Sequence, residues 1–339
     1  MEPRESEPKK AGGEVTIRAG LARGWLQELA NRLAPLLALL ALGLFLTLKS
    51  PFFATRRNLL TVALQVAPLA IVAMGQTFVI IAGGIDLSVG SVLALSGVVA
   101  GLMMTQEVVP LLRSPWSAGL MGAATGGLCG VFNGLVTTRA KMPPFIVTLG
   151  MMGIARGLAL LLTGGNPIFD LPDSFFTLAQ GYLWRIPIPV VLMFALAGLL
   201  HFVLAQTRFG RAAYAIGGNY QAARLSGLRV DRYLVSFFGL CGLLTGFAGV
   251  VQAARLISAQ PATGEMAELD AIAAAVIGGA SLLGGQGSIP GTIIGIFIMA
   301  LLRNGCNLLG VDPYWQQVAI GTMIILAVLY DHLRRRRRR

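Results

Sequence analysis

The sequence predicts an all-α, polytopic membrane protein with about ten transmembrane helices, some of them broken or re-entrant, and with a candidate two-half pseudo-repeat. Three features of the composition support this fold class: of the 339 residues 55% are hydrophobic, only 12% are charged, and 43 are glycine. A soluble domain carries about 25% charged residues, and a disordered chain needs high charge with low hydrophobicity, so both classes are excluded. Abundant glycine suits helices that pack closely within a membrane.

Ten apolar stretches approach the roughly 20 residues of helix that a hydrocarbon core requires. The eighth and ninth are separated only by a glycine-rich stretch at 284–287. They could be one broken helix or a re-entrant pair, so the count lies between eight and ten. The ten stretches are residues 33–48, 59–82, 86–104, 117–138, 145–163, 187–205, 234–253, 269–283, 288–303 and 314–330.

The distribution of positive charge predicts the orientation of the chain. The net charge is +12, with 27 Lys and Arg, and most of these residues fall in four segments on one side of the proposed membrane. Because cytoplasmic segments are enriched in Lys and Arg, both termini are expected in the cytoplasm. The charge therefore indicates topology and contact with lipid, and no nucleic-acid binding is expected. The four segments are residues 1–32, 139–144, 206–233 and 331–339.

These segments also divide the chain into domains. Residues 33–330 form the transmembrane domain, and residues 331–339 a basic tail that ends in six arginines. Residues 1–32 are polar and charged, without a small-residue cleavage site after the first apolar stretch. They are expected to be a cytoplasmic tail and not a cleaved signal peptide. Arg303 is assigned to an outer loop, at the end of the ninth stretch.

Two polar, glycine-rich breaks interrupt the apolar pattern. The first runs from Ile80 to Ser91 and contains Asp86 and Ser88; the second runs from Gly278 to Gly291 and repeats the order Gly-Gly, Ser, Gly-Ser. Asp86 could cap the helix that follows, or it could shape a substrate path, since acids within a membrane are costly and often functional. Matching breaks in two halves of a chain are typical of transporters.

Other polar side chains within or near the spans are candidates for a path that a neutral, hydroxyl-rich solute could follow. A buried amide in a membrane also commonly bonds a neighbouring helix, and Arg156 could be a packing anchor. No metal-ligand spacing and no nucleotide-binding motif occurs in the sequence, so no cofactor is expected on this chain. The candidate path or gate residues are Gln65, Gln76, Asp86, Ser88, Asn133, Thr148, Arg156, Asn304, Asn307 and Gln316.

The long basic loop at 206–233 has an unusual pattern for a solvated segment, because basic residues alternate with apolar ones. Asn219 is a suitable N-cap, Tyr220 to Ser226 can form two helical turns, and Gly227 can end them. The result is a short amphipathic helix at the cytoplasmic face. It could adhere to the membrane surface or, as the pattern favours, dock on a cytoplasmic partner.

Four motifs in order give the chain a family resemblance. They are Gly83–Gly90, Pro143–Gly150, the loop at 208–227 and the second break at 278–288. Together they resemble the permease subunits of bacterial ABC importers for ribose, xylose, arabinose and galactose, over about residues 35–330. Importers of autoinducer-2 share these motifs, so the motifs do not fix the sugar.

The resemblance implies a non-enzymatic permease of the bacterial inner membrane that translocates a monosaccharide by alternating access. It implies three protein partners: a second permease subunit, a periplasmic sugar-binding protein and a cytoplasmic ATPase that binds ATP and Mg²⁺. The loop at 206–233 would couple the permease to the ATPase. The coupling residues implied are Arg208, Gly210, Arg211, Gly217, Gly218, Asn219, Ala222, Ala223 and Gly227.

Two other classes compete with this interpretation. An ion-coupled secondary transporter would also contain paired broken helices, and Asp86 or Asp270 could then bind the ion, but the cytoplasmic loop would have no role. An integral membrane enzyme is disfavoured because the sequence has only two histidines and three cysteines and no cluster of acids.

Overall fold

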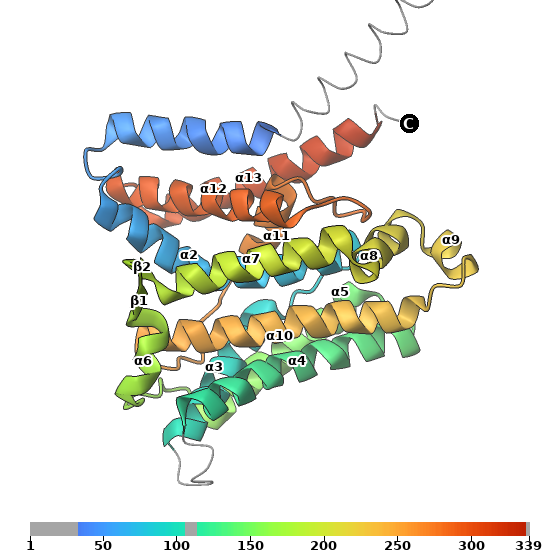
Figure 1. Ribbon diagram of the computed structural model, residues 1–339, viewed down its shortest axis with the longest axis horizontal. Helices are drawn as coiled ribbons and strands as arrows, with labels where there is room; N and C mark the ends of the chain where they lie inside the picture. Colours follow the sequence, from blue (N-terminus) through green and yellow to red (C-terminus); the bar gives the residue numbers. More distant parts are fainter. Residues whose placement is uncertain (1–32, 106–113, 337–339) are drawn as a thin grey trace, which may run out of the picture.

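The computed structural model describes residues 33–105 and 114–336, which form a bundle of antiparallel helices (Figure 1). The all-α, polytopic class is confirmed. In chain order the elements are a first helix Leu33–Lys49, α2 (Arg56–Ile81), α3 (Val89–Thr105), α4 (Pro115–Arg139), α5 (Pro144–Thr163), α6 (Asp173–Gln180), β1 (Tyr182–Leu183), β2 (Ile186–Pro187), α7 (Ile188–Gln206), α8 (Arg208–Gly218), α9 (Tyr220–Leu225), α10 (Val230–Leu256), α11 (Ala267–Ile277), α12 (Ile289–Leu308) and α13 (Pro313–Arg336).

Each of the ten predicted apolar stretches coincides with a helix. Among the described residues, six helices are long and apolar enough to cross a membrane, namely α2, α4, α5, α7, α10 and α12. The first helix and α3 are apolar but shorter. The predicted span at 269–283 is wrong in extent, because α11 has only 11 residues and ends at Ile277. At 1.5 Å per residue α11 covers about 16 Å, so α11 and α12 are two helices joined by a non-helical turn.

Glycine explains how closely the helices pack. Gly126 and Gly130 of α4 lie against the backbone of α10, where neither has room for a Cβ atom. The same holds from the α10 side of this contact, where a Cβ atom at Gly246 would lie only 2.7 Å from the carbonyl oxygen of Ala123 in α4. Glycine therefore lets the backbones of α4 and α10 come close together, as the high glycine content predicted.

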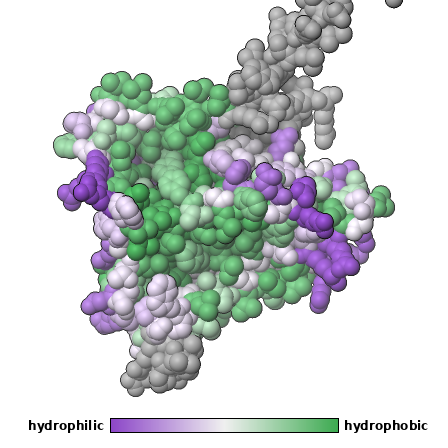
Figure 2. Space-filling view, in the orientation of Figure 1, coloured by the Kyte–Doolittle hydropathy of each residue, from purple (hydrophilic) through white to green (hydrophobic). Residues whose placement is uncertain are grey.

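The two ends of the described chain lie on the same side of the molecule. In Figure 1 the start of the first helix and the end of α13 are on the side that carries α8 and α9, and α6 and the β1–β2 hairpin are on the opposite side. Figure 2 shows apolar residues over the middle of the molecule and polar residues towards these two ends. This arrangement is the one expected of a protein surrounded by lipid.

Other sequence expectations need revision. Arg303 was assigned to an outer loop, but it lies within α12, since that helix continues to Leu308. α13 continues through Arg336, so the expected tail at 331–339 begins inside a helix. The expected tail at 1–32 lies outside the described residues. Between α5 and α7 the chain forms α6 and a two-stranded hairpin, which the apolar pattern did not predict.

Candidate functional site

The loop at 206–233 folds into two helices and not one. Thr207 caps α8 through its side chain, and Asn219 caps α9, with its Oδ1 accepting from the Ala222 N–H at 3.0 Å. Gly227 follows α9 with φ +85°. The predicted cap and end of the short helix are confirmed, whereas α8 was not predicted. α8 buries Gly210, Ala212, Ala213 and Ile216, and it leaves Arg208 and Arg211 exposed.

Other predicted coupling residues divide between the two faces of this segment. Gly218 and Ala222 are exposed, whereas Ala223 is buried, with 4% of its surface accessible. Only the exposed positions can touch a partner directly.

α8 rests on both glycine-rich breaks. Gly217 fits against the carbonyl oxygen of Ile81 and the N–H of Gly285, with no room for a Cβ atom. The Gly285 N–H itself donates to the Ile81 carbonyl oxygen at 2.8 Å. The Tyr214 hydroxyl donates to the Gly287 carbonyl oxygen at 2.8 Å. Burial raises the pKa of the Tyr214 phenol, so the hydroxyl keeps the proton that it donates.

The two breaks contain similar turns. Gly83 and Gly279 have φ values of +86° and +94°, which only glycine adopts readily, and each turns the chain sharply after a helix. The following helices begin after serines, Ser88 and Ser288. In the repeated order Gly-Gly, Ser, Gly-Ser, however, Gly83 is matched by Gly278 and Ser88 by Ser281, so the two similar turns do not fall at equivalent positions.

The remaining motif of the family resemblance, Pro143–Gly150, reaches the same region through a cavity of about 540 Å³ beside α9. Pro143 and Pro144 line it together with Gly83, Tyr220 and Arg224. All four motifs that carried the family resemblance thus meet on one side of the bundle.

Asp86 and its neighbours form a buried polar cluster at the first break. Asp86 Oδ1 accepts from the Ser88 N–H at 2.9 Å and from the Ser88 hydroxyl at 2.6 Å, and the Asn133 amide donates to the Ser88 oxygen at 3.0 Å. Thr148 donates to the Ile85 carbonyl oxygen at 3.3 Å. Asp86 is 1% exposed. These bonds organise the turn before α3. The predicted cap is not what the structure has, because Asp86 bonds Ser88, which precedes the helix, and none of the N–H groups of α3.

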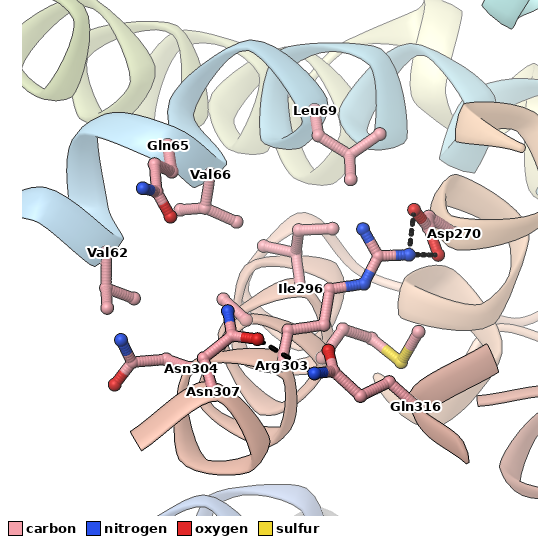
Figure 3. A pocket seen from close by; sticks show the side chains of 12 residues that line it. Val62, Gln65, Val66, Leu69, Asp270, Ile296, Arg303, Asn304, Asn307 and Gln316 are labelled. Carbon is pink, nitrogen blue, oxygen red and sulfur yellow. Dashed lines mark hydrogen bonds and ion pairs between the residues drawn. The ribbon is translucent and has the colours of Figure 1, made fainter. Parts of the chain in front are cut away.

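Four of the predicted path residues line a second polar region, a cavity of about 190 Å³ between α2, α11, α12 and α13 (Figure 3). They are Gln65, Asn304, Asn307 and Gln316. Gln316 donates to Asn307 Oδ1 at 2.8 Å, and the amides of Asn58 and Asn304 bond each other at 2.9 and 3.0 Å. Residues 62–69 of α2 and 296–307 of α12 line this cavity. The start of α2 and the end of α12 lie away from α8, on the side that carries the β1–β2 hairpin (Figure 1).

The sequence interpretation missed the strongest polar contact in this cavity. Arg303 Nη2 lies 2.7 Å from both carboxylate oxygens of Asp270. A signal was present, because an acid and a base at the edges of neighbouring apolar stretches suggest a pair. Asp270 was considered only as an ion site of a secondary transporter; here it is paired with an arginine.

The remaining candidates lie apart from both regions. Gln76 is fully buried on α2, where its Oε1 faces the Cys241 thiol at 3.7 Å. Arg156 donates to the carbonyl oxygens of Pro261 and Thr263, so it holds the non-helical segment before α11. Within the described part of the chain, no group of three His, Cys, Asp or Glu could hold a metal ion.

Comparison with known proteins identifies the family. Residues 58–328 match the family described as "Branched-chain amino acid transport system / permease component". The chain is 45% identical to a ribose import permease protein of Bacillus subtilis, over 89% of this chain and 92% of the relative. The corresponding protein of Escherichia coli K12 is 42% identical, over 94% and 98%.

A further relative widens the range of sugars among the similar proteins. An L-arabinose ABC transporter permease protein of Azospirillum brasilense is 37% identical, over 100% of this chain and 98% of the relative. No solved structure matches the chain. The chain belongs to this permease family, among the permease subunits of ABC importers for sugars.

Proposed function

We propose that this chain translocates a monosaccharide, a pentose or hexose, across the bacterial inner membrane by alternating access, driven by ATP hydrolysis on a separate subunit. The names of the relatives, which include ribose and L-arabinose permeases, support this substrate class. An autoinducer-2-like sugar derivative stays an alternative substrate. The observation that supports the mechanism is the close packing of α8 against the two breaks, where Gly217 contacts Ile81 and Gly285. We call this contact the seat of α8.

This seat provides a route from an ATPase to the helices. A force on α8 passes through Gly217 and Tyr214 to the turn at 278–288, which joins α11 to α12. It also reaches the end of α2 at Ile81. These helices line the polar cavity, so movement of α8 would change the shape of the cavity, as alternating access requires.

The two ends of the bundle would bind different protein partners. The ATPase, with its ATP and Mg²⁺, would bind the exposed face of α8 and α9 in the cytoplasm. A periplasmic sugar-binding protein would deliver the sugar at the opposite end, beside the β1–β2 hairpin. A second permease subunit, identical or homologous, would complete the path, and lipid would cover the apolar surface of the bundle.

The proposed function is tested in proteoliposomes that contain the permease, its candidate ATPase and its binding protein. Uptake of radiolabelled ribose, L-arabinose, allose and fructose is measured with ATP inside. We expect uptake of at least one sugar only when ATP and the ATPase are present. Uptake by the permease alone, driven by a sodium or proton gradient, would instead establish a secondary transporter.

One exposed residue should separate ATPase docking from folding. Leu225, at the end of α9, is 88% exposed, on the surface where the ATPase is proposed to bind. We expect Leu225→Asp to reduce co-purification of the ATPase about tenfold or more, the effect of losing an interface anchor. The melting temperature of the permease should not change.

The matched control for this variant is Gln221→Asp, at an exposed position of the same helix, which adds the same charge. If Leu225→Asp binds the ATPase as well as this control does, α9 is not part of the docking face.

A further inference from the structure

Three cavities meet at one ion pair in the bundle. Their volumes are about 190, 340 and 320 Å³, and Asp270 and Arg303 line all three. One water molecule takes up roughly 30 Å³, so each cavity has room for several waters or for a small polar solute. Figure 3 shows the pair in the first cavity, with Gln65 of α2 nearby.

The pair leaves hydrogen-bonding capacity unused. Both bonds to Asp270 come from a single nitrogen of Arg303, Nη2. Arg303 makes no other hydrogen bond within the described part of the chain, although a guanidinium has five N–H donors. Its side chain is 44% exposed, whereas that of Asp270 is 7% exposed. The remaining donors of Arg303 are therefore available to a ligand beside a carboxylate.

Packing of α11 on α12 does not require this pair. Gly278 lies against Gly291, and Gly295 against Ala274, with no room for a Cβ atom at any of the three glycines. These contacts already hold the two helices together. An ion pair with one partner this exposed contributes little to stability, and charged groups within membrane segments usually have a functional role.

We infer that Asp270 and Arg303 form a sugar-hydroxyl binding site within the permease itself, an inference that rests on the proposed function. A sugar hydroxyl can donate to the Asp270 carboxylate while a neighbouring hydroxyl accepts from Arg303, and both bonds are charge-assisted. Amides of Gln65, Asn304 and Gln316 line the same cavity and can bond further hydroxyls. The pair has no net charge, so it suits a neutral polyol and not a free cation.

The position of the site connects it to the ATP-driven movement of α8 that is proposed above. Asp270 is on α11 and Arg303 on α12, and the turn that joins these helices accepts the Tyr214 hydrogen bond. A shift of α8 would therefore move both binding groups together relative to Gln65 on α2. The affinity of the site for sugar can then differ between the two states of the transporter.

The test measures binding of ³H-ribose to the permease alone in nanodiscs, without the ATPase or the binding protein. We expect saturable binding to the wild type. Arg303→Gln and Asp270→Asn should each weaken it about tenfold or more, as expected on losing a hydrogen bond to a charged group. The control is Arg185→Gln, an exposed arginine in the β1–β2 turn, which should bind ribose like the wild type.

A second variant separates binding from stability. The exchange of the two residues, Asp270→Arg with Arg303→Asp, restores an ion pair and is expected to restore the melting temperature but not ribose binding, because donor and acceptor have changed places. Binding restored by the exchange, or no saturable binding of ribose, L-arabinose, allose or fructose to the wild type, would overturn the inference. Saturable binding without ATP-driven uptake would overturn the proposed function and leave the site standing.

Discussion

Replacement of Gly217 by leucine is expected to abolish sugar uptake. A Cβ atom at this position would meet backbone atoms, including the Gly285 nitrogen at 2.6 Å and the Ile81 carbonyl oxygen, which cannot move aside as a side chain can. α8 would have to leave its seat on the two breaks. We expect uptake in proteoliposomes to fall about a hundredfold or more, the effect of misplacing a positioning element by about 1 Å.

The neighbouring glycine provides the control for this experiment. Gly218 is exposed, and a Cβ atom there would have nothing within 4 Å. Gly218→Leu should therefore leave folding unchanged. The Gly217→Leu permease should still bind the ATPase, because the exposed face of α8 is intact. Because Gly218 lies on the exposed face that is proposed to bind the ATPase, uptake by each variant is divided by the amount of ATPase that co-purifies with it. Equal values for the two variants would show that the contacts of Gly217 do not transmit movement.

Replacement of Asp86 by leucine is expected to prevent folding. The variant would leave the Ser88 N–H and hydroxyl without the acceptor that they use now, in a position that is 1% exposed. Each buried group left unpaired costs about 1–3 kcal/mol, a large share of a typical stability of about 5–15 kcal/mol. The yield of monodisperse protein after extraction in detergent measures this effect.

The variant Asp86→Asn separates the role of the negative charge of Asp86 from the role of its hydrogen bonds to Ser88. An asparagine keeps an oxygen at the Oδ1 position, so the two bonds from Ser88 can form, and we expect a yield near that of wild type. Loss of uptake in a well-folded Asp86→Asn protein would assign the charge a role in the path. A folded Asp86→Leu protein with normal yield would show that the bonds from Asp86 to Ser88 are not needed to form the turn before α3.

Local features of the site could be predicted from the sequence. The cap at Asn219 depends on residues three positions apart, and the turn at Gly83 on a glycine that follows an apolar helix. The helix α8 is harder to predict, because three of its residues are glycines and glycine disfavours a helical conformation. Burial of Ala212, Ala213 and Ile216 against the bundle overrides that preference.

Contacts across long distances in the chain could not be predicted in this way. Gly217 is conspicuous in the sequence, but its partners Ile81 and Gly285 come from two other segments. Asp270 and Arg303 belong to different apolar stretches, and their pairing depends on how α11 packs against α12. The polar cavity depends on the arrangement of four helices, which hydropathy alone does not encode.

The short length of α11 has a consequence for the solute. α11 covers about 16 Å, whereas the hydrocarbon core is about 30 Å thick, so α11 cannot cross a membrane alone and non-helical residues beside it, at 257–266 or 278–288, must share the remaining depth. Irregular backbone at that depth must face protein or water and not lipid, and Arg156 already bonds two of its carbonyl groups. Two cavities, of about 340 and 320 Å³, lie between the segment 257–266 and Asp270, and we expect water to fill them. A solute that reaches Asp270 would then keep part of its hydration shell over this part of its path.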